Sequence, residues 1–180
     1  MEAEKKVLLE NEEVQRTISR MAHEIVEKSG GEKIVLIGIR SGGARLVRRI
    51  GRKIEMLTGN SPAVGVVDVT PYRDDTEKKP SEPPRMDVPV AVDDRTVVLV
   101  DDVINTGRTI RAAMEMLGHL GKPKKILVAT LVDRGDRELP IRADIVGKNV
   151  EVQDSERVNV MLQESNGADL VTVTKQQQRK

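Results

Sequence analysis

Aromatic side chains and cysteine are almost absent from this chain of 180 residues. It has no Phe, Trp or Cys and a single tyrosine, Tyr72. The lack of cysteine excludes disulfides, thiolate nucleophiles and cysteine-based zinc sites. One ring cannot form the platform on which many RNA-binding sheets stack bases, so that class of RNA reader is excluded as well. We therefore expect a core of aliphatic side chains and methionine.

Long apolar runs and a strong net charge are also missing. No stretch of about 18 apolar residues is present, so no transmembrane helix and no membrane partner are expected. The N-terminal segment MEAEKKVLLENEE lacks the apolar core of a signal peptide, and we expect a cytoplasmic protein. The 30 Lys+Arg residues balance 29 Asp+Glu residues. This balance argues against a general nucleic-acid coat, but it permits a local basic face.

The apolar pattern predicts alternating helices and strands. Helices are expected over residues 12–28, 44–57 and 108–120, and Asn11 is expected to cap the first. Near-continuous apolar runs predict buried strands over 33–39, 64–70, 96–100 and 125–132, with shorter candidates at 143–147, 158–162 and 170–173. This alternation is typical of an α/β fold with a mostly parallel sheet.

The segment from 71 to 92 differs from the rest of the chain. It contains Pro80, Pro83, Pro84 and Pro89 among mixed charges, with little periodicity. An irregular stretch of this length inside a compact domain is usually functional or disordered. We expect a single domain over residues 1–180, with a flexible loop at about 71–92 and a frayed tail at about 175–180.

The clearest chemical signal lies in residues 97–109, VVLVDDVINTGRT. An apolar strand ends in Asp101 and Asp102, and a loop with Thr106 and Gly107 then opens a helix. A helix N-terminus offers free N–H groups and a positive dipole end to a phosphate, and glycine lets the phosphate approach closely. The carboxylates, which would repel a phosphate, suit neutral hydroxyls. The segment predicts a ribose 5-phosphate site at the carboxyl end of a strand, against the alternative of a simple capped surface loop.

This segment resembles the phosphoribosyl-pyrophosphate (PRPP) motif of the type I phosphoribosyltransferases. More narrowly, the chain resembles the pyrimidine-operon attenuator/uracil phosphoribosyltransferase family, PyrR. The resembling blocks are residues 16–26 (RTISRMAHEIV), 68–75 (DVTPYRDD), 97–109, and 131–150 (LVDRGDRELPIRADIVGKNV). The last block is the most specific, because generic phosphoribosyltransferases lack it.

The resemblance implies a type I phosphoribosyltransferase fold, in which helices flank a parallel five-stranded sheet, with a small hood and a flexible active-site loop. It implies an enzyme that converts uracil and PRPP to UMP and pyrophosphate, with Mg²⁺ arriving on PRPP and no metal held directly by the protein. It further implies a regulator that binds pyrimidine-operon leader mRNA when UMP or UTP is bound and promotes transcription attenuation. Family members form dimers and tetramers, so a homodimer or homotetramer is expected.

The resemblance also assigns site residues by their matching positions. The catalytic residues are Asp101, Asp102 and Arg73. The PRPP-binding residues are Asp101, Asp102, Val103, Asn105, Thr106, Gly107, Arg108 and Thr109, and the pyrophosphate loop is Arg40, Ser41 and Gly42. Asp133 and Arg134 flank the uracil, and the flexible loop starts at Tyr72, Arg73, Asp74 and Asp75. The RNA face comprises Ser19, Arg20, Arg137, Arg142 and Lys148.

Three single positions and one stretch of five residues depart from the family pattern and leave alternatives open. Gly42 replaces the usual Arg of the pyrophosphate loop, and Asp136 replaces a His on the RNA face. Pro71 replaces an apolar residue, and residues 151–155 (EVQDS) are acidic where the family has Pro-Thr-Ser-Arg-Ser. A phosphoribosyltransferase without RNA binding is one alternative, a nucleotide-sensing RNA binder with weak or no catalysis is a second, and a purine-type enzyme is a third.

A basic run in the second expected helix has a simpler interpretation. The run consists of Arg40, Arg45, Arg48, Arg49, Arg52 and Lys53. We expect a solvated helix face for all of these except Arg40, which belongs to the pyrophosphate loop. Because His23 and His119 are the only histidines in the chain, a histidine-based zinc site is not expected.

Overall fold

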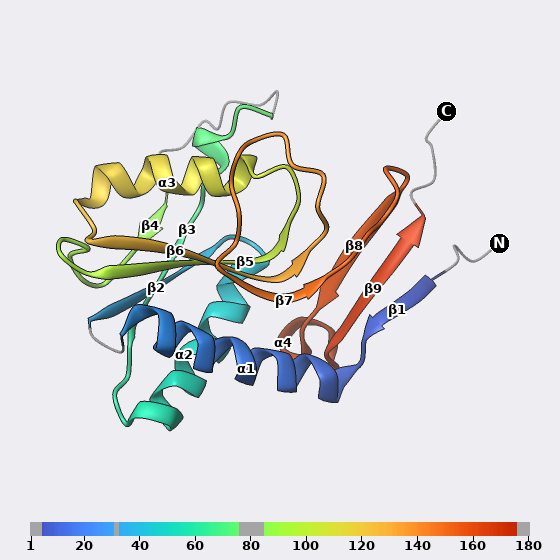
Figure 1. The fold of residues 1–180 in the computed structure, drawn as a ribbon, viewed down its shortest axis with the longest axis horizontal. Helices are drawn as coiled ribbons and strands as arrows, with labels where there is room; N and C mark the ends of the chain where they lie inside the picture. Colours follow the sequence, from blue (N-terminus) through green and yellow to red (C-terminus); the bar gives the residue numbers. More distant parts are fainter. Residues whose placement is uncertain (1–4, 31–32, 76–84, 176–180) are drawn as a thin grey trace.

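The computed structural model describes residues 5–30, 33–75 and 85–175 and contains two sheets (Figure 1). The strands of the larger sheet are β2 (Ile34–Ile39), β3 (Ala63–Val67), β4 (Met86–Asp87), β5 (Thr96–Ile104), β6 (Lys125–Asp133) and β7 (Ile145–Asn149). The smaller sheet consists of β1 (Lys5–Leu9), β8 (Glu156–Met161) and β9 (Leu170–Lys175). The helices are α1 (Asn11–Ser29), α2 (Gly43–Thr58), α3 (Arg108–Leu120) and the short α4 (Gln163–Asn166), and a 3₁₀ turn spans Thr70–Tyr72.

The larger sheet has the strand order β4-β3-β2-β5-β6-β7. The neighbouring strands β3, β2, β5, β6 and β7 run parallel to one another, as expected. The short β4 pairs antiparallel with the outer edge of β3. The three antiparallel strands β1, β9 and β8, together with α4, form a separate small unit at one end of the sheet (Figure 1). This unit is the expected hood, and we use that name for it below.

Helices cover both faces of the larger sheet, with α1 and α2 on one side and α3 on the other (Figure 1). The packing of β5 explains why its residues 97–100 are apolar at consecutive positions. Val98 and Val100 point to the core beneath α1 and α2, whereas Val97 and Leu99 point to the core beneath α3. The fully buried side chains of both cores are aliphatic or methionine. The aliphatic core expected from the composition is therefore confirmed.

Several local expectations are wrong in detail. β5 continues through Asp101 to Ile104 instead of ending before the two carboxylates, because β6 extends alongside it and pairs Ile104 with Asp133. Glu10, not Asn11, caps α1, and its N–H donates to the Glu13 carboxylate at 2.9 Å. β1, β4 and α4 were not expected: β4 and α4 have only two and four residues, and β1 (KKVLL) shows no alternation of polar and apolar residues.

Two expected mobile segments lie partly outside the described residues. Of the loop at 71–92, residues 76–84 are not described, and the remainder includes part of the 3₁₀ turn, the strand β4 and the buried Val92. Of the tail at 175–180, only Lys175 is described, as the last residue of β9. No helix in the described part of the chain is long and apolar enough to cross a membrane.

The hood is joined to the larger unit by apolar packing and by one buried ion cluster. Leu9, Val158 and Val171 share a core cluster with residues of α1 and α2. Arg49 of α2 pairs with Glu164 and with Asp169, whose side chain is fully buried. The expectation that Arg49 lies on a solvated helix face is therefore wrong, since two acidic residues more than 100 positions away cover it.

Acidification is expected to destabilise the protein through this cluster. Burial alone would raise the pKa of Asp169, but hydrogen bonds from Arg49 and from the Gln163 N–H outweigh burial and hold it below its ordinary value. The hydrogen bond from Arg49 likewise lowers the pKa of Glu164. Because the folded-state pKa values are the lower ones, this stabilisation is complete above the unfolded pKa of about 4 and is lost as the pH falls below it.

The measurement compares the native protein with Asp169→Asn. Between about pH 5 and about pH 3 the melting temperature of the native protein should fall further than that of the variant. Equal falls would show that Asp169 does not contribute to the acid sensitivity.

Candidate functional site

The expected site segments meet at one edge of the larger sheet. Residues 40–43 follow β2, residues 101–107 end β5 and enter α3, and residues 133–141 follow β6. Since β2, β5 and β6 are parallel neighbours, their carboxyl ends lie side by side. Ligands of open α/β sheets bind at this edge, so the topology brings together the segments that the sequence singled out.

Asp101 and Asp102 occupy different environments at the end of β5. Asp101 is 7% exposed, and its carboxylate accepts a hydrogen bond from the Asp102 N–H at 2.9 Å. Asp102 is partly exposed, and its carboxylate accepts from the Val103 N–H at 2.8 Å. Burial and then the neighbouring Asp102 charge raise the pKa of Asp101 well above its usual value. Asp101 is thus easier to protonate than a carboxyl in water, whereas Asp102 faces the accessible side.

The start of α3 has the form of a phosphate cradle. Gly107 adopts a left-handed conformation with φ of 93°, which glycine adopts without strain, and α3 begins at the next residue. The Arg108 N–H donates to Thr106 Oγ1 at 3.3 Å, and the first turn of α3 provides N–H groups without intrahelical partners. The predicted phosphate-binding residues therefore lie on a tight turn and a helix N-terminus.

The loop after β2 lies directly against Asp102. The peptide bond between Arg40 and Ser41 is cis, and Arg40 is exposed. A Cβ atom added to Gly42 would lie 2.0 Å from Asp102 Oδ2. The glycine that replaces the family's arginine therefore leaves the space that the Asp102 carboxylate occupies.

The start of the expected flexible loop is attached to α3 by polar contacts. Arg111 donates to the Tyr72 carbonyl at 2.8 Å, and Arg108 binds Asp74 at 2.9 Å. Arg73 binds Asp75 at 2.6 Å, and the Tyr72 ring lies 5.7 Å from that of His119. Tyr72 is half-buried and packs against the core cluster beneath α3, so the single tyrosine of the chain fastens the loop to the body of the protein.

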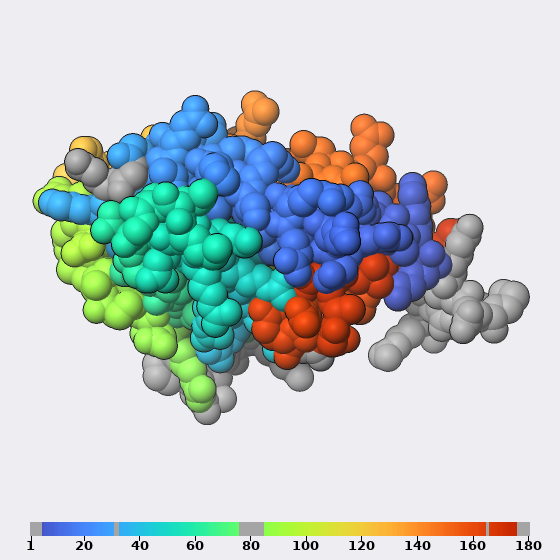
Figure 2. Space-filling view, turned by 90° about the horizontal axis from the view of Figure 1, so that it is seen from below, coloured from blue at the N-terminus to red at the C-terminus, as the bar shows by residue number. Residues whose placement is uncertain are grey.

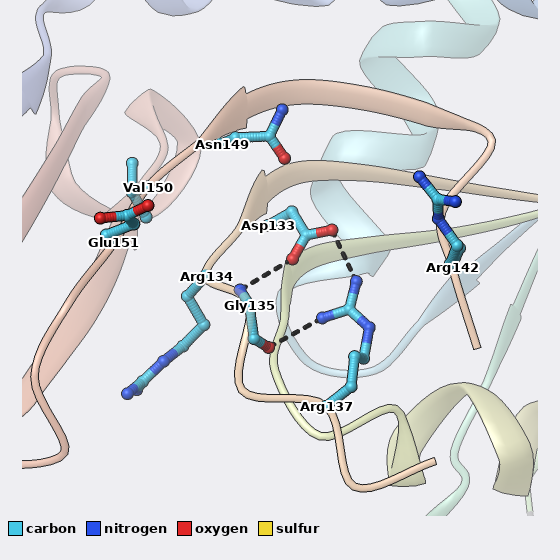
Figure 3. Close-up of a pocket in the computed structure, with 8 residues that line it drawn as sticks. All are labelled: Asp133, Arg134, Gly135, Arg137, Arg142, Asn149, Val150 and Glu151. Atoms are coloured by element: carbon cyan, nitrogen blue, oxygen red, sulfur yellow. Dashed lines mark hydrogen bonds and ion pairs between the residues drawn. The ribbon is translucent and has the colours of Figure 1, made fainter. Parts of the chain in front are cut away.

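A pocket of about 760 Å³ opens where β6 and β7 end (Figure 3). It is lined by Asp133, Arg134, Gly135, Arg137, Arg142, Asn149, Val150 and Glu151. The Asp133 carboxylate accepts from the Gly135 N–H at 2.9 Å and from the Arg137 guanidinium at 2.5 Å. The Arg134 side chain turns away from this pair, and it donates to the Glu156 carbonyl of the hood at 3.3 Å.

A second pocket of about 580 Å³ joins Asp102 to the hood. Its polar lining includes Lys5 of β1, Arg157 and Asn159 of β8, and Thr172 and Thr174 of β9. Sequence reasoning missed all of these residues, since they lie outside the recognised motifs. The only signal was the alternation of Arg157 and Asn159 along β8, which places two polar side chains on one face of a short strand.

The residues expected to bind RNA come from α1, from β7 and from the segment after β6. Arg20 of α1 donates to the Val146 and Gly147 carbonyls, which brings it beside the strand that carries Lys148. Arg137 donates to the carbonyls of Asn105, Gly135 and Ile141 and to the carboxylate of Asp133. Ser19 is half-buried and Arg142 is exposed. Arg20 and Arg137 therefore have internal partners in this conformation.

The oxygen ligands near the site are few. Among the described residues, no group of three or more His, Asp or Glu side chains converges as a metal cage. Asp102 presents a carboxylate at the accessible edge beside the buried Asp101, and carboxylate oxygens suit Mg²⁺, which binds through one or two carboxylates together with substrate phosphates and water. The residues present fit a magnesium ion that a phosphorylated substrate brings with it.

Solved structures support the assignment of the fold. A crystal structure of the hypoxanthine phosphoribosyltransferase of Trypanosoma cruzi matches with a TM-score of 0.72 at 20% identity, over 97% of this chain and 98% of that chain. A hypoxanthine phosphoribosyltransferase from Staphylococcus aureus matches with a TM-score of 0.67 at 23% identity, over 84% and 79% of the two chains. At these identities the likeness establishes the fold.

Sequence comparison is more specific. The model of the phosphoribosyl transferase domain matches residues 5–163. The bifunctional protein PyrR of Bacillus subtilis is 45% identical over 175 residues, which cover 94% of this chain and 97% of the relative. The bifunctional protein PyrR of Corynebacterium glutamicum is 48% identical over 176 residues, covering 94% and 92%. The chain belongs to the phosphoribosyl transferase domain family and, within it, to the PyrR family.

Proposed function

We propose that this protein is a uracil phosphoribosyltransferase that converts uracil and PRPP to UMP and pyrophosphate. The observation that carries the proposal is the juxtaposition of Asp101 and Asp102 with the phosphate cradle at the start of α3. Hydroxyl-binding carboxylates beside a phosphate-binding helix N-terminus match a ribose 5-phosphate. Membership of the PyrR family, with relatives at 45% and 48% identity, supports the choice of reaction.

Each part of the substrate has a proposed set of partners. Asp101 and Asp102 accept hydrogen bonds from the ribose hydroxyls, and the 5-phosphate lies against Val103, Asn105, Thr106, Gly107, Arg108 and Thr109. The pyrophosphate lies against Arg40, Ser41 and Gly42 and brings Mg²⁺, which neutralises the charge of the leaving group. Uracil lies beside Asp133 and Arg134, in reach of the pocket shown in Figure 3.

The reaction is a displacement at C1 of the ribose. The bond from C1 to the pyrophosphate oxygen breaks and its electron pair stays on pyrophosphate, N1 of uracil bonds to C1, and the N1 proton passes to solvent. Positive charge develops on the ribose, and carboxylates already oriented beside it stabilise that charge without reorganisation. The remaining contribution is positioning of the two reactants, which can supply a large share of the rate enhancement. Arg73, which is paired with Asp75, adds a cation at the start of the loop.

The test is to incubate the protein with uracil, PRPP and Mg²⁺ and to measure UMP by chromatography. Formation of UMP, with little product from hypoxanthine or guanine, is the expected result. Product from purines alone would favour the purine-type alternative. An absence of any product would favour the nucleotide-sensing alternative that Gly42 suggests, because that residue replaces the arginine of the pyrophosphate loop.

We further propose that the protein regulates pyrimidine-operon transcription by binding leader mRNA when UMP or UTP is bound. Its relatives are described as bifunctional, which supports a second activity. Arg142 is exposed and Lys148 is partly exposed, so cations from β7 and from the segment after β6 are available to phosphates. Titration of the leader RNA with and without UMP tests this. Binding that UMP strengthens supports regulation, and no binding at low salt would leave only the enzyme.

A further inference from the structure

Arg49 differs from the other cations of its helix. Arg45, Arg48 and Arg52 are exposed, whereas the Arg49 side chain is 15% exposed. α2 and the segment of α4 and β9 touch on the face shown in Figure 2, and Arg49 lies at this junction according to its hydrogen bonds. A cation with so little exposure needs partners that replace water, and the hood provides them.

The partners of Arg49 are two carboxylates, each bound through two hydrogen bonds. Glu164 accepts from Nε at 2.7 Å and from Nη2 at 2.6 Å. Asp169 accepts from Nη1 at 2.6 Å and from Nη2 at 2.8 Å. A guanidinium can bind two carboxylates in this way because its donors point in fixed directions, and a lysine ammonium cannot reproduce the arrangement.

The two carboxylates lie in the connection between β8 and β9. β8 ends at Met161, α4 spans Gln163–Asn166, and β9 begins at Leu170. The Asp169 carboxylate also accepts from the Gln163 N–H at 2.7 Å, which ties the two ends of the connection together. Arg49 therefore holds the turn of the β8–β9 hairpin on α2.

The same hairpin forms a wall of the site. Arg157 pairs with Thr174 and Asn159 with Thr172 across its two strands, and all four side chains line the pocket that contains Asp102. At the start of β8, the Glu156 carbonyl accepts from Arg134. A tilt of the hairpin about its turn would thus change the region next to the proposed uracil contacts.

We propose that Arg49 is a positioning residue of the nucleotide site, which sets the placement of the hood against Arg134 and thereby the affinity for the base. The inference rests on the proposed uracil phosphoribosyltransferase function. Arg49 contacts no substrate and acts through the hairpin. PRPP is held largely by residues 40–42 and 101–109 of the larger unit, so Arg49 affects the base and leaves PRPP binding nearly unchanged.

The test measures KM for uracil, KM for PRPP and kcat of Arg49→Lys, and the Kd of UMP by calorimetry. The expected result is a rise of about tenfold in KM for uracil and in the Kd of UMP, equal to about 1.4 kcal/mol, with kcat and KM for PRPP within about twofold of the native values. Arg48→Lys, an exposed neighbour on the same helix, is the matched control and should leave all four quantities unchanged. Glu164→Gln keeps the contacts between Arg49 and Asp169, so it should give a smaller rise in KM for uracil and in the Kd of UMP. This variant tests the inference if Arg49→Lys does not fold.

Three results would overturn the inference. The first is a KM for uracil and a Kd of UMP within about twofold of native in both Arg49→Lys and Glu164→Gln. The second is an equal rise in KM for uracil and for PRPP. The third is a fall in kcat alone, which is what a smaller fraction of folded enzyme produces. Failure of the proposed function is seen separately, in native protein that forms no UMP. The ratio of the UMP Kd values of variant and native protein then still decides the role of Arg49.

Discussion

Replacement of both Asp101 and Asp102 by Asn is expected to lower kcat/KM for UMP formation by about 10³-fold or more. The two carboxylates are the groups proposed to accept the ribose hydroxyls and to stabilise positive charge at C1. Asparagine keeps the size of each side chain, and its carbonyl oxygen can keep the hydrogen bonds from the Asp102 and Val103 N–H groups. The double variant should therefore fold and lose the negative charge, so the effect reports on chemistry.

The burial of Asp101 leads to a second expected result, which concerns the melting temperature of the double variant. Burial raises the pKa of Asp101, so replacing it by a neutral amide removes a desolvation penalty. The double variant should accordingly melt at a temperature equal to or above that of the native protein. Glu12→Gln/Glu27→Gln, which removes two exposed charges from α1, is the matched control and should keep native activity. Unchanged turnover in the Asp101→Asn/Asp102→Asn protein would refute the site assignment.

Gly42→Ala is expected to lower kcat/KM by about 10²-fold, although it adds a single methyl group. The new Cβ would lie 2.0 Å from Oδ2, 2.1 Å from Cγ and 2.5 Å from Oδ1 of Asp102. Real Cβ atoms do not approach other atoms so closely, so the Asp102 carboxylate must turn away from its position. Because the obstacle is a side chain that can rotate, the fold should survive while the ribose contacts are lost.

Two further variants show whether this explanation is right. Gly118→Ala in α3 adds the same methyl group where nothing lies within 4 Å, and it should keep activity and raise the stability slightly. Gly42→Arg supplies the arginine that the family pattern has at this position, yet it adds the same Cβ. Since the family pattern combines an arginine here with the same pair of carboxylates, we expect Gly42→Arg to recover part of the activity that Gly42→Ala loses. Native kcat/KM in Gly42→Ala would contradict the proposed contact.

The helices and central strands could be predicted because the spacing of their apolar residues along the chain matches the faces that they bury. β5 is apolar at consecutive positions since it is covered on both faces, and α3 begins at the expected residue since Gly107 and the apolar spacing mark it. The PRPP-type segment was recognisable for a related reason. Its residues are contiguous, so the order of strand, carboxylates, glycine turn and helix is written directly in the chain.

The hood side of the site could not be predicted in the same way. Lys5 and Thr174 lie near opposite ends of the chain, and they line one pocket because β1 pairs with β9. Arg49 reads as one cation in a basic run, and only the approach of Glu164 and Asp169 distinguishes it. Period and spacing report which face of an element is apolar, but they do not report which distant element covers it.

By itself, the sequence determined the α/β class, the aliphatic core that follows from a chain with one tyrosine and no Phe or Trp, and the order of strand, carboxylates, glycine turn and helix at the end of β5. These features depend on local order and on composition. Only the tertiary structure decided that Gly42 makes room for Asp102, that Arg49 is an internal residue and that hood residues share a pocket with Asp102. The reason is physical: the first two contacts join residues 60 and 120 positions apart, and the geometry of all three exists only when separate elements have packed.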